Sequence, residues 1–236
     1  MVNVNRKMNI NRKLKNVFAD KATLVLRAMI KQPDKKWVVR DFVNELSISL
    51  GMASEVVKAL EKSGYLERQK KGPSSYSILT NKDKLIQDWV KYYNFDLNTT
   101  VLFYNPDLGL NKIKSFFKQS SMEEKYAFTL HTGANFETSY VKTGNIYLYI
   151  DHASFDKILL DLRQQLDLKQ LVQGGNVYLI KPYYKNSVFW GVQKKRGFNV
   201  VSNLQLYLDL YNFKPRGLEH AKFLKEQLEH KGLSLD

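Results

Sequence analysis

The sequence contains no cysteine, which excludes disulfide bonds, zinc sites with cysteine ligands and thiol catalysis. It also lacks any apolar run close to the ~18–20 residues that a membrane-spanning helix requires. The first sixteen residues, MVNVNRKMNINRKLKN, are basic but have no apolar core of the kind found in signal peptides. We therefore expect a soluble, cytoplasmic protein with no membrane partner.

Signatures of catalysis are scarce as well. No two of the four histidines lie at helical spacing from each other, so each is predicted to be structural or exposed: His131, His152, His220 and His230. No serine lies in a G-x-S-x-G setting, and the QGGN segment (173–176) lacks the Lys-Ser/Thr of a phosphate-binding loop, so we interpret it as a hairpin-type turn. The sequence thus predicts a protein that is not an enzyme, with no cofactor and no metal.

Positive charge is what the chain has in excess. It has 37 Lys and Arg against 23 Asp and Glu, a net charge of +14, and an isoelectric point of about 9.6. Residues 1–85 hold 18 basic and 8 acidic residues, whereas residues 86–236 hold 19 and 15. A surplus of this size favours a polyanionic partner, and its position favours a binding surface in the first third of the chain.

The length of 236 residues is sufficient for two domains. We expect residues 1–16 to form a flexible basic tail, or alternatively an arm that touches phosphates. Residues 17–80 are predicted to be the first domain, residues 81–95 a bridging helix, and residues 96–236 a second domain. The predicted fold class is α+β.

Hydrophobic periodicity predicts helices over 17–31 and 40–47 and a third helix after Ser49, with a short strand at 36–39. Ser49 is a suitable N-cap for the third helix, and Gly64 a suitable left-handed C-terminal residue. Two strands, YLERQ and YSIL, follow on either side of the basic loop 70–75. Three short helices and a two-stranded hairpin predict a winged helix-turn-helix.

A winged helix places its second helix-turn-helix helix in the major groove of DNA. The predicted outer face of the third helix is small or polar, so that it can enter the groove, and Ser54 and Lys58 can donate hydrogen bonds to bases or phosphates. The predicted DNA contacts of the helix are Ser49, Leu50, Met52, Ser54, Glu55 and Lys58. Those of the wing are Arg68, Lys70, Lys71, Ser74 and Ser75.

After residue 96 the pattern changes. Strand-like runs alternate with helical stretches at 108–119, 154–167, 203–212 and 216–230, which predicts a mixed α/β domain. The strand-like runs are 101–104, 126–130, 145–150, 176–180 and 198–202.

Three ordered segments of this half carry a family resemblance. YAFTLHTGA (126–134) is interpreted as a strand and a Thr-Gly-Ala turn, and GGNVYLIKPYYKNSVFWG (174–191) as two strands around Pro-Tyr-Tyr. VVSNLQLYLDLYNFKPRGLEHAKFLKEQL (200–228) has a Ser-x-x-Gln start and an Arg-Gly-x-Glu-x-Ala helix opening. Following the bridging helix, they resemble the AbiEi family, antitoxins and transcriptional regulators of type IV toxin–antitoxin systems linked to phage abortive infection.

The resemblance implies a DNA-binding repressor that acts on its own promoter, or operator, through the N-terminal winged helix. It also implies that the C-terminal domain counters a nucleotidyltransferase-like toxin, for which direct contact is not required. The motif positions are Thr132, Gly133, Ala134, Ser202, Gln205, Asp209, Arg216, Gly217, Glu219 and Ala221.

From the residues themselves, two interpretations of these motif positions stay open. In one, a buried contact between Asp209 and Arg216, or between Gln205 and the backbone, ties the last two helices together. In the other, they belong to an exposed patch that includes Lys194, Lys195 and Arg196 and touches nucleic acid.

Two other classes of function also stay open. The first is a metal-dependent nuclease targeted by the winged helix, for which Glu137, Asp151 and Lys157 are the candidate residues. The second is a scaffold whose winged helix binds another protein rather than DNA.

Overall fold

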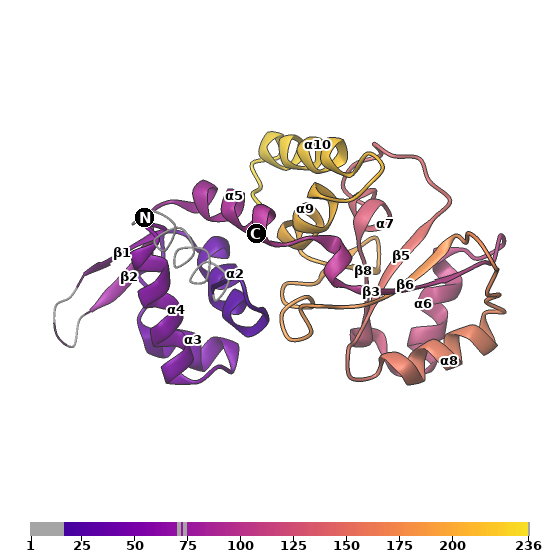
Figure 1. Cartoon of the computed structure of the whole chain (residues 1–236), viewed down its shortest axis with the longest axis horizontal. Helices are drawn as coiled ribbons and strands as arrows, with labels where there is room; N and C mark the ends of the chain where they lie inside the picture. Colours follow the sequence, from indigo (N-terminus) through magenta and orange to yellow (C-terminus); the bar gives the residue numbers. More distant parts are fainter. Residues whose placement is uncertain (1–16, 70–71, 73–74, 236) are drawn as a thin grey trace, which may run out of the picture. The chain divides into compact units, whose positions relative to one another are not determined.

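The computed structural model describes residues 17–69, 72 and 75–235. The chain forms two compact units, of which the first ends at Tyr93 and the second spans Asn94–Leu235 (Figure 1). The basic tail predicted at 1–16 lies outside the described residues. Helix α5 (Lys82–Tyr92), in the segment interpreted as a bridge, groups with the first unit.

The first unit opens with a short 3-10 turn, η1 (Asp20–Ala22), which leads directly into helix α2 (Thr23–Lys31). Helix α3 (Val39–Leu46) and helix α4 (Leu50–Lys62) follow. Only Ser47, Ile48 and Ser49 separate α3 from α4, and Ser47 has a positive φ of 52° that turns the chain sharply. Helices α3 and α4 are therefore joined by a turn of three residues.

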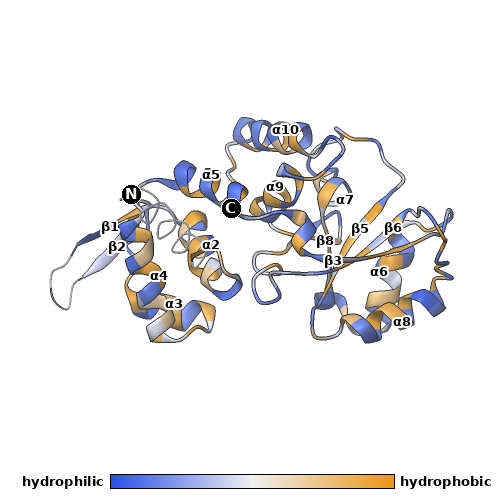
Figure 2. Ribbon diagram, viewed as in Figure 1, coloured by the Kyte–Doolittle hydropathy of each residue, from blue (hydrophilic) through white to orange (hydrophobic). Residues whose placement is uncertain are grey.

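Helix α4 begins and ends at the residues that the sequence indicates. The Ser49 side chain accepts a hydrogen bond from the Met52 backbone N–H at 3.2 Å, which satisfies an amide with no partner inside the helix. Gly64, just beyond the last turn, has a φ of 72°, a conformation that costs glycine little. Figure 2 shows polar and apolar residues interleaved along α4, as expected of a helix with one buried face.

Strands β1 (Leu66–Gln69) and β2 (Tyr76–Leu79) pair antiparallel, with Leu66 opposite Leu79. The strand expected at 36–39 is reduced to Trp37, which exchanges two backbone hydrogen bonds with Ser77 of β2 at 2.8 and 2.7 Å. Val39 already belongs to α3. The buried Trp37 indole stacks on Phe42 with ring centroids 4.7 Å apart, so this bridge ties the hairpin to α3.

The second unit is built on a mixed six-stranded sheet in the order β3-β6-β5-β4-β8-β7. Its strands are β3 (Thr99–Phe103), β4 (Tyr126–Phe128), β5 (Ile146–Ile150), β6 (Val177–Lys181), β7 (Gln193–Lys195) and β8 (Phe198–Val200). Strands β5 and β6 are parallel and are connected through helix α8 (Phe155–Gln165). Strands β4 and β8 are also parallel, and the other neighbours are antiparallel. The chain is therefore a mixed α/β protein, as expected.

Helices cover both faces of this sheet (Figure 1). Tyr126 of β4 stacks on Phe117 of helix α6 (Leu110–Gln119), with ring centroids 4.2 Å apart. Tyr149 of β5 instead reaches helix α9 (Asn203–Tyr211), where its hydroxyl donates to Asp209. The last helix, α10 (Gly217–His230), packs on α9, and so does the short helix α7 (Leu130–Ala134).

Three local expectations for this unit were wrong. The segment after β4 is the helix α7 rather than a continued strand and turn, because Leu130 has a φ of 46° that ends the strand. Residues 174–191 contain one strand, β6, followed by turns over 183–191. The glycines of 173–176 do not form a hairpin, because they lie between α8 and β6 and β6 runs parallel to β5.

Candidate nucleic-acid interface

The exposed face of α4 carries two lysines and no bulky aromatic side chain. Ala53, Val56, Val57 and Leu60 are buried and hold the helix against the first unit. On the opposite side lie Gly51, Glu55, Lys58 and Lys62, all exposed and spaced three or four residues apart so that they share one face. Gly51, Glu55, Lys58 and Lys62 therefore form the outer face of α4.

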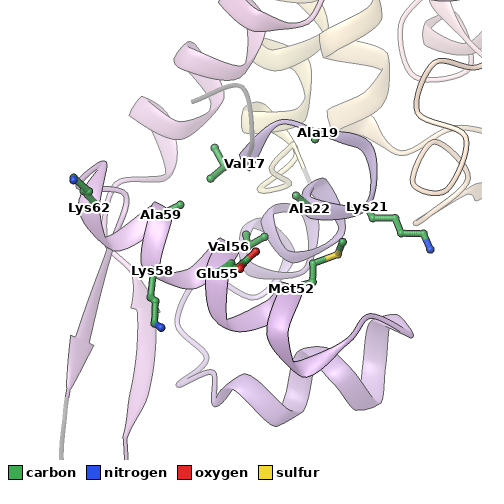
Figure 3. A pocket seen from close by; sticks show the side chains of 10 residues that line it. All are labelled: Val17, Ala19, Lys21, Ala22, Met52, Glu55, Val56, Lys58, Ala59 and Lys62. Atoms are coloured by element: carbon green, nitrogen blue, oxygen red, sulfur yellow. The ribbon is translucent and has the colours of Figure 1, made fainter. Parts of the chain in front are cut away.

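The other helix residues predicted to contact DNA are placed differently. Leu50 is 54% exposed at the first turn, and Ser54 is half-buried. Met52 is half-buried and lies at the margin of the exposed face, where it lines a groove between α4 and the segment Val17–Ala22 (Figure 3). Ser49 is exposed, but its hydroxyl oxygen already caps the helix.

The β1–β2 hairpin, predicted to be a wing, is only partly described. Arg68 on β1 forms an ion pair with Glu61 of α4, with Nη1 and Oε2 3.5 Å apart, and its side chain is 19% exposed. The Ser75 hydroxyl donates to the Gly72 carbonyl at 2.7 Å, within the turn. The Arg68–Glu61 pair therefore fixes the hairpin against the end of α4, whereas Lys70, Lys71 and Ser74 lie outside the described residues.

Two further lysines belong to this surface and were missed at the sequence level. Lys62 follows Lys58 by four residues, so helical periodicity alone would have placed both on one face. Lys21 of η1 lies across the groove from α4 and lines it together with Lys58 and Lys62. No local pattern in the sequence indicates that η1 and α4 are neighbours.

Most of the C-terminal motif positions are buried and serve packing. The Thr132 hydroxyl donates to the Asn145 carbonyl and accepts from the Tyr147 N–H, each at 3.0 Å, which joins α7 to β5. A Cβ added to Gly133 would lie 2.7 Å from a Leu206 methyl and 2.9 Å from the Phe128 carbonyl oxygen. Glycine at 133 thus lets α7 approach β4 and α9 closely.

Asp209 is fully buried and accepts hydrogen bonds from three side chains. Gln205 Nε2 donates to it at 2.8 Å and the Tyr149 hydroxyl at 3.1 Å, and the Thr129 hydroxyl donates to its second oxygen. Ser202 caps the same helix by accepting from the Gln205 N–H at 3.2 Å. This network fastens α9 to strands β4 and β5.

The expected contact between Asp209 and Arg216 is absent, because Arg216 is exposed and points elsewhere. Its Nε lies 3.2 Å from an oxygen of Glu219, in an exposed ion pair, and its guanidinium lies 5.3 Å from the centre of the Tyr140 ring. Glycine at 217 instead lets α10 begin close to the end of α9, because a Cβ at this position would clash with the Leu210 carbonyl oxygen.

Two histidines that are 89 residues apart in the sequence form a buried stacked pair. The rings of His131 and His220 are 5.2 Å apart at an angle of 7°, with the Nδ1 atoms 2.9 Å apart. His131 Nε2 lies 3.3 Å from the Pro215 carbonyl oxygen, an obligatory acceptor, so this nitrogen carries a proton. In the neutral pair His220 Nδ1 then donates to His131 Nδ1, and the bare His220 Nε2 lies 2.8 Å from the Thr138 hydroxyl, whose single proton can also go to the Ala134 carbonyl oxygen at 3.2 Å.

Protonating His131 at Nδ1 would place two N–H groups against each other, and protonating His220 at Nε2 would leave the new N–H with only the Thr138 hydroxyl oxygen to receive it. Burial lowers the pKa of His220 to about 4, and the neighbouring His131 and Arg216 contribute to this shift. Burial also lowers the pKa of His131. Protons therefore bind to the unfolded chain first as the pH falls below the ordinary histidine value.

We predict that acid destabilises the second unit through this pair. Stability is retained above about pH 6.5 and falls by about 3 kcal/mol between pH 6.5 and pH 4, from His220 alone. The loss of stability is measured by hydrogen exchange of peptides from α9 and α10, after correction for the change of the intrinsic exchange rates with pH. His220→Gln should reduce the slope between pH 6.5 and 5, and His230→Gln, at an exposed position, should not. An unchanged slope in His220→Gln would contradict the assignment.

The residues considered for a nuclease do not converge. Glu137 forms ion pairs with Lys195 and with Lys231, the latter at 3.1 Å. Burial acts to raise the pKa of Glu137, but the hydrogen bonds from both lysines outweigh it and lower the pKa. Asp151 instead pairs with Lys125 at 3.7 Å and accepts from the Ser154 hydroxyl. Within the described ranges, no three His, Cys, Asp or Glu residues are grouped so as to hold a metal ion.

The two units define a mixed α/β protein whose first unit consists of short helices and a two-stranded hairpin. Residues 78–229, well over half of the chain, match the family model described as "Transcriptional regulator, AbiEi antitoxin, Type IV TA system". The chain therefore belongs to the AbiEi antitoxin family, which confirms the resemblance found in the sequence. No curated protein and no solved structure matches the chain.

The limits of the matched segment show which elements the family assignment includes. It begins in β2, contains α5 and ends within α10, so helices α2, α3 and α4 lie before it. The family assignment thus depends mainly on the second unit and does not extend to helices α2, α3 and α4. Separately, no helix among the residues that the structure describes is long and apolar enough to cross a membrane.

Proposed function

We propose that this protein is a sequence-specific DNA-binding repressor of its own type IV toxin–antitoxin operon. In this proposal, residues 17–80 form a winged helix-turn-helix that reads double-stranded DNA with α4. The second unit provides the antitoxin activity against a nucleotidyltransferase-like toxin, without requiring contact with it. The family, whose members are described as transcriptional regulators, supports the regulatory role.

The observation that carries the DNA-binding proposal is the exposed face of α4. Its basic residues, Lys58 and Lys62, lie one helical turn apart, beside the small Gly51 and the half-buried Ser54. A helix with this outer face fits the major groove, and cations on it can contact phosphates or base acceptors. The adjoining wing residues Lys70 and Lys71 would add two further positive charges.

A gel-shift assay with DNA from upstream of the chain's own gene tests the proposal. We expect binding that a scrambled fragment of the same composition does not show. Replacing Lys58, Lys70 and Lys71 together by Ala should weaken binding roughly 100-fold, because each lost phosphate contact costs on the order of 1 kcal/mol. Arg68 is left in place because its ion pair with Glu61 positions the hairpin.

The matched control removes the same net charge from the second unit, at the exposed positions Lys142, Lys157 and Lys222. This control variant should retain nearly the full affinity. Equal loss in both variants would show that overall charge, rather than the face of α4 and its wing, governs binding. Equal binding of the scrambled fragment would contradict sequence-specific recognition.

Antitoxin activity is tested by co-expression with the product of a nucleotidyltransferase-like gene beside this one. We expect the chain to restore the growth of cells that the toxin arrests. Rescue by the Lys58, Lys70 and Lys71 variant would place this activity apart from DNA binding, in the second unit.

A further inference from the structure

A concavity that combines an apolar floor with a charged margin lies in the first unit. It has a volume of about 640 Å³ and separates α4 from the segment Val17–Ala22. Small-molecule sites typically occupy roughly 300–1,000 Å³ and are mostly apolar. The size therefore suits a single small organic ligand.

The floor of this groove is apolar. Val17, Ala22 and Val56 are buried, at 1%, 6% and 6% exposure, and the half-buried Met52 and Ala59 continue the same lining. Figure 3 shows these side chains between the N-terminal segment on one side and α4 on the other. Such a surface favours the aromatic or aliphatic body of a ligand over a chain of phosphates.

The margin of the groove carries a positive surplus. Three exposed lysines, Lys21, Lys58 and Lys62, line it together with one exposed acid, Glu55. Figure 3 shows the lysine side chains extending outward from the floor, where their long stems leave the ammonium groups in solvent. The three side chains point in different directions, so an anionic group at the edge of a ligand could meet one of these ammonium groups while its apolar body fills the floor.

We propose that this groove binds a small anionic amphiphile, an aromatic or aliphatic body that bears one carboxylate or sulfonate. The charge of the margin selects against the alternative occupant, residues 1–16 of the same chain, which carry five basic residues and no acidic one. An anion is attracted by the three lysines and repelled only by Glu55. Glu55 and Lys58 lie next to each other on α4 and carry opposite charges. Glu55 should therefore weaken the binding of an anionic ligand, and Lys58 should strengthen it.

Ligand binding would regulate the protein if the proposed function holds. Met52, Glu55 and Lys58 line the groove and also belong to the residues proposed to contact DNA. A ligand that engages Lys58 and covers Met52 therefore competes with DNA for α4. This consequence depends on the proposed function, whereas ligand binding itself does not.

Titration of the full chain with 8-anilinonaphthalene-1-sulfonate tests the site, because this probe has an apolar body and one sulfonate and fluoresces when its body is buried. We expect saturable binding of one molecule per chain. Glu55→Gln should tighten binding about 3-fold and Lys58→Gln weaken it about 3-fold, which is the scale of exposed charge pairs. The neutral analogue N-phenyl-1-naphthylamine should bind more weakly and respond to neither substitution.

Ala59→Phe, which fills the groove from its half-buried margin, should abolish binding while circular dichroism shows an intact fold. The second unit exposes the apolar side chains of Leu160 and Val172, at 62% and 109%, and an apolar probe could bind to them instead of to the groove. The control Leu160→Ser, Val172→Ser should therefore bind normally. Loss of binding in this control, or full binding in Ala59→Phe, would overturn the proposal, as would an absence of binding to the unaltered chain.

Competition with DNA is measured separately, by adding the probe to the preformed complex with upstream DNA. Release of the DNA at saturating probe supports regulation through α4, and retention of the DNA would overturn this part of the proposal. A chain that binds the probe but no DNA would contradict the proposed function and leave the site standing. A chain that binds DNA but no probe would contradict the ligand site and leave the proposed function standing.

Discussion

Replacing Gly217 by Ala should destabilise the second unit by about 3 kcal/mol, the upper range for overpacking in a closely packed interior. The added methyl would collide with the Leu210 carbonyl oxygen and lie 2.9 Å from the Phe213 Cβ. A backbone carbonyl cannot rotate away as a long side chain can, so α10 itself must shift relative to α9. Urea denaturation followed by circular dichroism, with hydrogen exchange of α9 and α10, measures the loss.

Gly144 provides the matched control, since a Cβ there has no heavy atom within 4 Å and its φ is not in the left-handed region. Gly144→Ala should therefore leave stability within about 0.5 kcal/mol of the unaltered chain. Gly133→Ala should resemble Gly217→Ala, because its methyl would meet the Phe128 carbonyl oxygen at 2.9 Å. If Gly217→Ala left the stability of the second unit unchanged, the close approach of α9 and α10 would be contradicted.

These glycines change the interpretation of the family motif. The Thr-Gly-Ala and Arg-Gly segments hold α7, α9 and α10 together, and the Ser-x-x-Gln start caps α9 and supports Asp209. Among the family motif positions, Arg216 and Glu219 are exposed and form an ion pair with each other. Residues that recognise a partner of the second unit are therefore to be sought among its surface residues rather than among the buried motif positions.

The elements of the first unit could be predicted because their signals are local. Ser49 caps α4 within its own first turn, and Gly64 ends it just beyond the last. The burial of Ala53, Val56, Val57 and Leu60 follows from helical spacing alone. The hairpin is also local, since its two strands are neighbours in the sequence.

The contacts of the second unit could not be predicted in this way. Thr129 and Asp209 are 80 residues apart, and His131 and His220 are 89 apart. No spacing rule reports such pairs, because they depend on how α7, α9 and α10 pack on the sheet. The same limit applies to the groove, whose two walls belong to η1 and α4, and to the single helical turn of α7, which is too short to show periodicity.

DNA binding should fall steeply with salt. Six or more phosphate contacts would reduce affinity about 1,000-fold between 50 and 200 mM KCl, because each contact releases condensed counterions. In the variant that replaces Lys58, Lys70 and Lys71 by Ala, three such contacts are lost. A plot of log affinity against log salt should then be shallower by about 2.7, that is by about 0.9 for each lysine.

The Lys142, Lys157 and Lys222 control should keep the original slope, since it loses the same charge at positions away from the proposed interface. The slope distinguishes direct contact from general attraction, because a change in net charge alone shifts the affinity without removing bound phosphates. An unaltered slope in the first variant would show that these three lysines do not contact the DNA backbone. A slope reduced by about 2 would show that two of the three lysines contact phosphates, and Lys58→Ala alone, with the original slope kept, would then assign Lys58 to a base edge.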